Sequence, residues 1–490
     1  MKSVVDTNAS LEHRRNKLKR LFVYSSMVGL FFSKEVRIMG LKLLPLLVGI
    51  FLFLPQLVTD AAAASEDDAA PEIFKPVVGT PEYESIFREQ SGTAGDVFGR
   101  RSGYIHPFVS VGGYYTSNIF RSDDDERSDT VLVVSPGVWL ALPATRQQLV
   151  EVETMNTAPG GLELSRFSIE TERRFQAYAL YRGEFQENKN FQEAEVDDHR
   201  AEGLLVYRFR GGLSVELLNI FENDHDPFST GDAEERQLDT WRSNFLNPVI
   251  SYQVSPKTRL QLDYSWYVLD YDSARRDFRD REDHAVSGYV FYQFAPKTSV
   301  FLDYEYLAVD YDNDVSRDNH ENRLFGGIQW NATDKSQGRL KVGYGKKEFE
   351  GSADEDRDSY AVEAQLRHRF TRKTSIIVKA VRRAGETDVE DTRDVLTHQL
   401  RVGLTHLLTA KLTGRVAFSY HEKDYEGEIT EGGKTDERKD DKYRAEIAIG
   451  WSPQRWLNFS TGYVYNERDS NFNTRDYEDH TVYLHVTAAL

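Results

Sequence analysis

The chain has 490 residues, with 61 basic and 79 acidic side chains, a formal charge of −18, 12% aromatic residues and no cysteine. The missing cysteine excludes cysteine-ligated metal sites, disulfide scaffolds and thiol catalysis. A mean hydropathy of −0.56 excludes a bundle of membrane-spanning helices, and the acidic balance argues against nucleic acid as a partner. A soluble β-rich protein or a transmembrane β-barrel fits, because barrel strands are only weakly apolar.

Residues 1–64 are typical of an N-terminal extension followed by a signal peptide. An apolar stretch, residues 43–58, follows a basic start and precedes Ala61-Ala62-Ala63-Ala64-Ser65, a run of small residues like those at cleavage sites. The layout favours a true translation start at Met39. A membrane anchor is the alternative, which the two prolines and the alanine run disfavour. We therefore expect export through a cleaved signal peptide.

Residues 65–103 mix polar and small side chains without any alternation. Thr80-Pro81-Glu82 predicts a helix start, with proline at the first helical position. We expect this stretch to form a periplasmic N-terminal segment ahead of the main domain, residues 104–490.

From Tyr104 onward, segments of 10 to 15 residues alternate apolar and polar side chains, which is the pattern of β-strands. Residues 143–174 interrupt it as a long excursion whose own structure the pattern leaves open. We predict 18 strands, over residues 104–120, 129–142, 175–187, 199–210, 213–224, 239–253, 258–272, 281–294, 299–312, 319–331, 337–350, 357–370, 374–388, 394–407, 411–425, 440–452, 456–468 and 477–489.

An internal repeat of 40 residues supports a meander of hairpins. Ser255-Pro256-Lys257-Thr258 returns as Ala295-Pro296-Lys297-Thr298, and Leu262-Asp263-Tyr264 returns as Leu302-Asp303-Tyr304. Each period holds two strands, a tight turn and a longer acidic loop. A four-stranded propeller blade would need twice as many strands in that length.

The connections sort by strand parity. Odd-to-even junctions, such as residues 188–198, 225–238 and 426–439, are long and acidic, whereas even-to-odd junctions are short and often basic. Long extracellular loops, short periplasmic turns and an even strand count are the geometry of bacterial outer-membrane barrels. A soluble sandwich has no reason to sort its loops in this way. We therefore predict an all-β fold, an up-and-down antiparallel transmembrane barrel of about 18 strands.

The alternation also assigns the two faces of each strand. In the seventh strand Leu260, Leu262 and Tyr264 share one face, and Gln261 and Asp263 share the other. An 18-stranded closed sheet is too wide for one layer of side chains to fill, so its interior should be wet. We expect the polar face to line the lumen and the apolar face to meet lipid.

The strands from 337 to 468 carry basic side chains at expected lumen positions. One interpretation is a basic track for an anionic solute. The other is that these bases pair with acids of the lumen or of residues 65–100. The candidates are Arg339, Lys341, Arg367, Arg369, Lys379, Arg401, Arg415 and Arg444.

Aromatic side chains at expected lumen positions cluster on the seventh to tenth strands. They could form a surface on which sugars stack, or they could belong to interface girdles or pack against an inserted plug. The candidates are Tyr267, Tyr289, Phe291, Phe301 and Phe325.

The chain offers no candidate catalytic residues. No nucleophile elbow, phosphate loop or dinucleotide motif stands in its proper context. Asp310, Asp312 and Asp314 resemble calcium ligands superficially, but the glycine and terminal glutamate of an EF-hand are missing. We expect no enzyme activity, no cofactor and no metal site.

Residues 104–490 resemble a family of outer-membrane β-barrel porins found with bacterial exopolysaccharide export genes. The resemblance rests on His106-Pro107, on Asn118-Ile119-Phe120-Arg121-Ser122-Asp123-Asp124, on Val134-Ser135-Pro136-Gly137, on His199-Arg200 and on the Pro-Lys-Thr turns. It implies passage of a polysaccharide through the Gram-negative outer membrane, beside lipid and lipopolysaccharide, together with a periplasmic polysaccharide-export protein.

We expect the first of the following three functions, and the other two are its alternatives. The first is export of a polysaccharide without chemistry in the barrel. The second is a general diffusion porin for small solutes. The third is a structural surface protein with a plugged lumen, whose acidic loops bind partners or divalent cations.

Overall fold

The computed structural model describes residues 103–145, 174–231, 236–333, 335–350, 356–454 and 456–489. Eighteen strands make up most of this part: β1 (Gly103–Thr116), β2 (Asp129–Thr145), β3 (Phe175–Asn188), β4 (Val196–Arg208), β5 (Leu213–Asp226), β6 (Asp239–Ser255), β7 (Thr258–Tyr271), β8 (Arg281–Ala295), β9 (Thr298–Tyr311), β10 (Asn319–Thr333), β11 (Ser336–Phe349), β12 (Arg357–Arg369), β13 (Thr374–Gly385), β14 (Asp394–Leu407), β15 (Leu412–Glu431), β16 (Lys434–Gln454), β17 (Leu457–Ser470) and β18 (Tyr477–Ala489).

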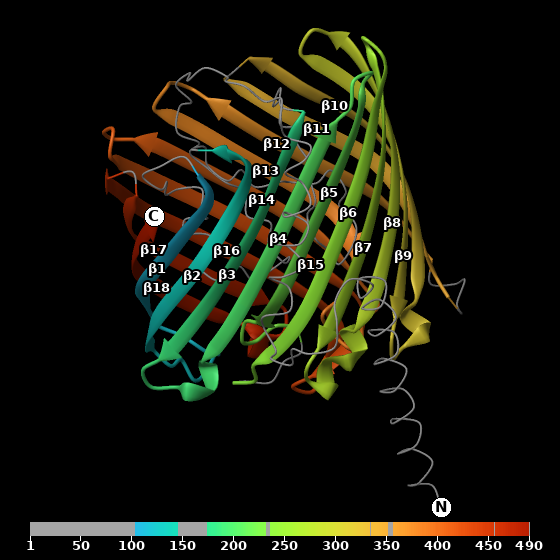
Figure 1. Ribbon diagram of the computed structural model, residues 1–490. Helices are drawn as coiled ribbons and strands as arrows, with labels where there is room; N and C mark the ends of the chain where they lie inside the picture. Colours follow the sequence, from blue (N-terminus) through green and yellow to red (C-terminus); the bar gives the residue numbers. More distant parts are fainter. Residues whose placement is uncertain are drawn as a thin grey trace, which may run out of the picture. The chain divides into compact units, whose positions relative to one another are not determined.

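These strands form one closed antiparallel sheet. Each strand pairs with the next along the chain, and β1 pairs with β18 from Phe108 opposite Ala489 to Thr116 opposite Thr481. Figure 1 shows the resulting barrel, whose strands are tilted and close on themselves. The predicted up-and-down barrel of 18 strands is therefore confirmed. No helix among the described residues is long and apolar enough to cross a membrane.

The predicted strand bounds agree with the structure to within a few residues, except at the last long hairpin. Residues 426–439 do not form the predicted acidic loop, because β15 continues to Glu431 and β16 begins at Lys434. Gly432 and Gly433 alone make the turn, with φ of +61° and +81°. Two consecutive positive φ values are those of a tight hairpin turn that glycine adopts readily.

Several sequence predictions fall on residues that the structure does not describe. The excursion over 143–174 contributes its first residues to β2, which ends at Thr145, and 146–173 lie outside the described part. The signal peptide over 1–64 and nearly all of the segment 65–103 also lie outside it.

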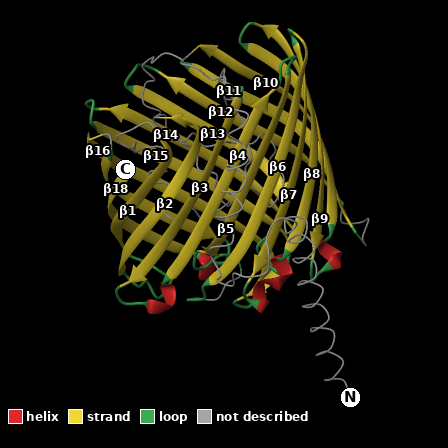
Figure 2. Ribbon diagram, viewed as in Figure 1, coloured by secondary structure: helices red, strands yellow, loops and turns green. Residues whose placement is uncertain are grey.

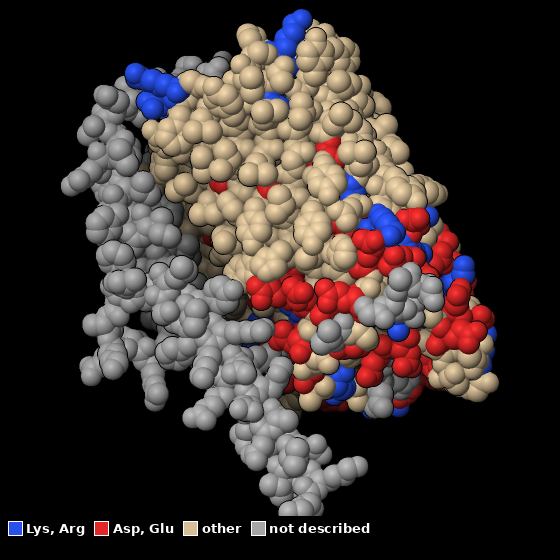
Figure 3. Space-filling view, turned by 90° about the vertical axis from the view of Figure 1, so that its right-hand side faces the viewer, with Lys and Arg blue, Asp and Glu red and all other residues tan. Residues whose placement is uncertain are grey.

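The outer surface of the barrel is apolar. On β7 the side chains of Leu260 and Leu262 are 42% and 52% exposed, whereas Gln261 between them and Asp263 after them are buried on the inner face. The same parity holds on β18, where Val482 and Leu484 are exposed and Tyr483 is buried. Figure 3 shows a broad band of uncharged residues on the outside. Exposure of such a large apolar band is unfavourable in water but favourable in lipid.

The two ends of the barrel differ, as the sequence predicts. Turns as short as two residues, such as 256–257 between β6 and β7, lie at one end. The longer junctions lie at the other end, together with the short 3-10 helices η4 (Gln192–Ala194), η5 (Ala274–Arg279), η6 (Val315–Arg317) and η8 (Asn473–Arg475), drawn in red in Figure 2. We call these the short-turn end and the long-loop end.

The apolar exterior predicts a position-dependent cost of an introduced charge. Leu302 on the outer face of β9 is 63% exposed, in the middle of the apolar band. Replacing Leu302 with Arg should lower the free energy of unfolding in lipid vesicles by about 2–4 kcal/mol. Thr298→Arg, on the same face beside the short turn, should cost only about 0–1 kcal/mol. Equal costs in a denaturant titration would contradict a lipid-facing band.

Candidate functional site

The inner face of the barrel holds all eight basic candidates. They project from β11 to β16 with the same parity as the buried residues of those strands. Strand register places four of them in one row together with two uncharged polar side chains. We call this row the basic row: Arg339, Gln365, Lys379, Arg401, Ser419 and Arg444. Lys379 and Arg401 are direct cross-strand neighbours.

At least three of the basic candidates pair with acids inside the barrel. Lys341 lies 2.8 Å from Asp303 and also contacts Glu305, and all three are buried. Arg339 lies 3.4 Å from Glu363. These bases therefore agree with the second interpretation of the sequence, in which the bases pair with acids of the lumen. Arg444 likewise lies 3.8 Å from Glu446.

The aromatic candidates are also inside the barrel, and four of them lie near one another. The rings of Tyr289 and Phe291 stack at 5.7 Å, and Phe301 lies 5.3 Å from Phe291. Lys341 Nζ lies 3.9 Å from the ring centre of Phe325. All of these rings are buried, with at most 4% exposure. Their surroundings are those of packed side chains rather than of an open stacking surface.

Tyr267 lies apart from these four rings. It belongs to a larger buried cluster on the inner faces of β1 to β7, which also contains Leu269, Phe245 and Trp241. All five aromatic residues therefore lie on the inner face, as the alternation predicts, but Tyr267 does not belong to the group that the other four form.

The loop between β5 and β6 reaches across the long-loop end of the barrel. Arg468 on β17, six strands away around the sheet, donates to the carbonyl of Ser229 at 2.7 Å. Arg438 on β16 donates to the carbonyl of Gly231 at 2.6 Å. Arg276 of η5 donates to the carbonyl of Thr230 at 2.9 Å. These three guanidinium groups are buried and fix residues 227–231 across the mouth.

The loop between β13 and β14 meets the first loop there. Gly231 has φ of +56°, and a Cβ at this position would lie 2.0 Å from the carbonyl oxygen of Asp388. Only glycine allows this approach. On the other side Arg317 of η6 donates to the carbonyl of Thr392 at 3.1 Å. We call residues 227–231 and 386–392 together the mouth loops.

Buried ion pairs anchor the mouth loop over 386–392. Lys347 lies 2.6 Å from Glu386, and Lys423 lies 3.3 Å from Asp388. Burial opposes ionisation of both carboxyls, but the neighbouring ammonium groups outweigh it. The pKa of Glu386 is therefore lowered, and that of Asp388 lies well below its usual range. Both acids are held in the charged form that the anchors require.

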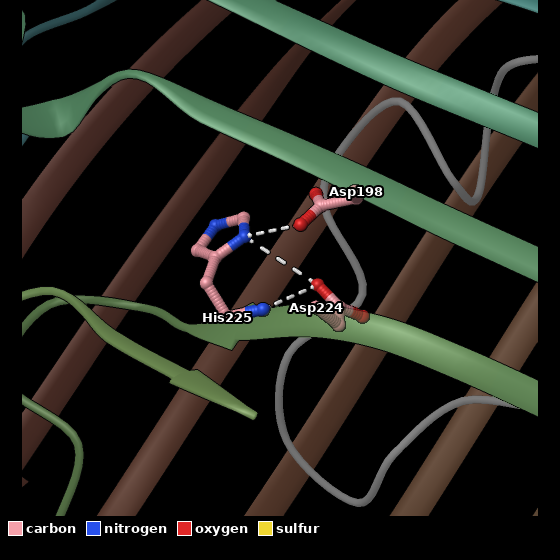
Figure 4. Close-up of side chains that lie close together, drawn as sticks. All are labelled: Asp198, Asp224 and His225. Carbon is pink, nitrogen blue, oxygen red and sulfur yellow. Dashed lines mark hydrogen bonds and ion pairs between the residues drawn. The ribbon is translucent and has the colours of Figure 1, made fainter. Parts of the chain in front are cut away.

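Two groups of side chains within the described residues have ligand atoms close enough to hold a metal ion: Asp198 with Asp224 and His225, and His398 with Glu422 and Asp424. Figure 4 shows the first group, at the long-loop ends of β4 and β5. His225 Nδ1 lies 3.0 Å from Asp198 Oδ1 and 3.4 Å from Asp224 Oδ1. The shorter distance requires a proton between the two atoms, so Nδ1 in this arrangement is not available to a metal.

The local sequence pattern predicted neither the mouth loops nor these two groups of side chains. Arg468 and Ser229 are 239 residues apart, and Asp198 and His225 are 27 apart. Strand pairing and barrel closure bring them together. The only local signal was the glycine in the loop 225–238, which could have suggested a tight contact.

A comparison with protein families matches residues 253–490 to the family described as “Putative beta-barrel porin 2”. The match covers 238 of the 490 residues, from the end of β6 onward. No curated protein sequence matches the chain.

Similar solved structures include the outer-membrane protein OpdK of Pseudomonas aeruginosa, with 10% identity and a TM-score of 0.38 over 79% of this chain and 99% of that one. A BenF-like porin from Pseudomonas fluorescens Pf-5 has 8% identity and a TM-score of 0.41 over 79% and 99%. OccAB4 of Acinetobacter baumannii has 8% identity and a TM-score of 0.41 over 80% and 99%. Similarity at this level does not indicate a solute.

The closed barrel, its apolar exterior and the family match describe a porin-like barrel of the Gram-negative outer membrane. They favour a channel over an enzyme.

The anchor of the second mouth loop predicts a dependence on pH. Because the pKa of Glu386 is lowered in the folded protein, its contribution is present at neutral pH and is lost as the pH falls through that lowered value. Glu386→Gln should imitate this loss at pH 7 and raise the rate of proteolysis within 386–393 about tenfold or more, because Lys347 keeps Asp394 as a buried partner but loses the ion pair that ties it to the loop. Glu390→Gln, an exposed change of equal charge in the same loop, should leave the rate unchanged. Equal rates for both variants would show that the ion pair does not hold the loop.

Proposed function

We propose that the protein is a passive channel for small anionic solutes in the outer membrane. The observation that carries the proposal is the basic row. Lys379 and Arg401 lie side by side on the inner face, with Arg444 two strands further on and Ser419 between them. Like charges on facing positions of neighbouring strands repel, and an anion beside them relieves that repulsion.

The position of the row strengthens its effect on a solute. A charge inside a narrow passage with low-dielectric walls acts over a longer range than the same charge on an open surface. Arg367, Arg369 and Arg415 add positive charge on the same inner faces, nearer the short-turn end. A small anion entering from that end therefore meets favourable potential before it reaches the row.

The mouth loops favour a small solute over a polymer. Residues 227–231 and 386–392 contact each other across the long-loop end and are held by buried arginine and lysine side chains. Polysaccharide export, which the family resemblance implies, would require these contacts to break for each chain that passes. The contacts therefore weigh toward the diffusion porin.

A structural protein with a plugged lumen is the second candidate. Its support is the burial of inner side chains: Asp303 and Lys341 have no exposed surface, and Phe325 is 1% exposed. A channel and a plugged barrel differ in one measurable property, which is ion conductance.

Purified full-length protein in a planar lipid bilayer tests the proposal. We expect stepwise conductance with preference for anions. Absence of conductance from folded, inserted protein would favour the plugged barrel. A deletion strain with a complemented control tests the export function separately: unchanged surface polysaccharide is expected, whereas its loss with build-up in the periplasm would favour export.

Charge reversal in the basic row should change ion selectivity. The double variant Lys379→Glu with Arg401→Glu should lower the anion-to-cation permeability ratio by about twofold or more, because the row then attracts cations. Lys379→Glu alone, compared with Arg382→Glu, gives a pair of variants with the same change of charge, because Arg382 lies on the outer face of β13 over the ring of Tyr360. Reversal potentials in a potassium chloride gradient measure the ratio. An unchanged ratio in the double variant would remove the row from the conduction path.

A further inference from the structure

The short-turn end carries a ring of exposed positive charge. Every described short turn from β4–β5 to β14–β15 contributes at least one exposed cation: Arg210, Lys257, Lys297, Lys335, Arg372, Lys373 and Lys411. We call these residues the turn cations. In Figure 3 basic side chains stand at the end of the molecule opposite the one where acidic side chains gather, with the uncharged band between them.

The turn cations differ from the cations at the other end of the barrel. Within the described residues, Arg210, Lys257, Lys297, Arg372 and Lys373 form no ion pair. At the long-loop end, Lys189 is likewise exposed without an ion pair in the described part of the chain, but several exposed cations pair with acids of the chain: Arg242 with Asp272, Lys346 with Glu348 and Lys439 with Asp424. In a chain with 18 excess acids, cations left without an acid are available to an anion from outside.

The neighbouring side chains place the turn cations at the membrane interface. Phe209, Phe294 and Phe370, each within three residues of a turn cation, are 47%, 53% and 56% exposed on the barrel surface. Exposed aromatic rings at the edge of an apolar band lie at the level of lipid headgroups. The ammonium and guanidinium groups beside them therefore lie at the depth of the lipid phosphates.

We propose that the turn cations bind the phosphate groups of anionic phospholipids around the short-turn end. The cations extend over six hairpins, from β4–β5 to β14–β15, and a layer of lipid surrounds a barrel in the same way. An acidic protein partner would instead be expected to contact cations gathered on one side. The proposal rests on the outer-membrane placement of the barrel, and it is independent of which solute passes.

Spin-labelled lipids test the proposal directly. The full-length protein is reconstituted in phosphatidylcholine vesicles that contain a trace of spin-labelled phosphatidylglycerol or spin-labelled phosphatidylcholine. Electron paramagnetic resonance gives the fraction of each label immobilised on the protein, and hence a ratio of association constants. We expect phosphatidylglycerol to be preferred at low salt, and the preference to weaken in 1 M salt, where charges are screened.

Two variants with equal charge changes locate the effect. The turn variant combines Arg210→Gln, Lys257→Gln, Lys297→Gln and Lys373→Gln. The loop variant combines Arg242→Gln, Lys346→Gln, Lys434→Gln and Lys439→Gln at the other end, where each cation pairs with an acid. Removing one cation beside a headgroup should weaken the association of phosphatidylglycerol at that position by about fivefold. The ratio should therefore fall toward one in the turn variant and stay unchanged in the loop variant.

Three results would overturn the proposal: equal association of the two lipids with the unmodified protein, an equal loss in both variants, or an undiminished preference in the turn variant. Far-UV circular dichroism checks that each variant keeps its strand content. The two proposals fail in different measurements. An absence of conductance would contradict the channel proposal but would not change the ratio of lipid association constants.

Discussion

The structure depends on one constraint, the pairing of every strand with two neighbours in a sheet that alternates apolar and polar side chains. A sheet without edges leaves no backbone group unpaired, so it can lie in lipid. Because the side-chain period is two, the register that turns Leu262 outward also turns Asp263 inward, and a slip of one residue would reverse both. The closure of β1 onto β18 therefore fixes the exterior and the lumen together.

The distribution of charge follows from that closure. A charge on the outer face costs free energy in lipid, so basic and acidic side chains concentrate in the lumen and at the two ends. At the long-loop end, acids and arginines from distant strands meet. The pair of Lys347 and Glu386 and the bonds of Arg438 and Arg468 define one arrangement of the mouth loops. Removing one partner of such a buried pair is costly, although the pair itself adds little net stability.

Local sequence predicted most of the fold, because strand alternation and turn composition act within a few residues. The bounds of β14 and β18 and the inward positions of Lys379 and Phe325 were predictable in this way. The turn at Gly432 and Gly433 was missed because the acidic residues around it resemble a loop, although they alternate well enough to pair.

The contacts of the mouth could not be predicted from local pattern. They join segments that are neighbours only after the barrel has closed, as Arg468 and Ser229 are, or only in one strand register, as Asp198 and His225 are. The pairing of particular bases with lumen acids could not be predicted from local pattern either. Lys341 reaches Asp303 across an intervening strand, and no spacing in the sequence shows that.

We expect the polar face of the sheet to line a water-filled lumen and the apolar face to meet lipid. The chain has no cysteine, so each introduced cysteine is unique. Single cysteines at Lys379, Arg401 and Ser419, and at their neighbours Val378, Leu400 and Phe418, can be tested in lipid vesicles with a water-soluble maleimide. We expect reaction at the first three positions and protection at the other three. The reverse pattern, or equal reaction at all six, would contradict this expectation.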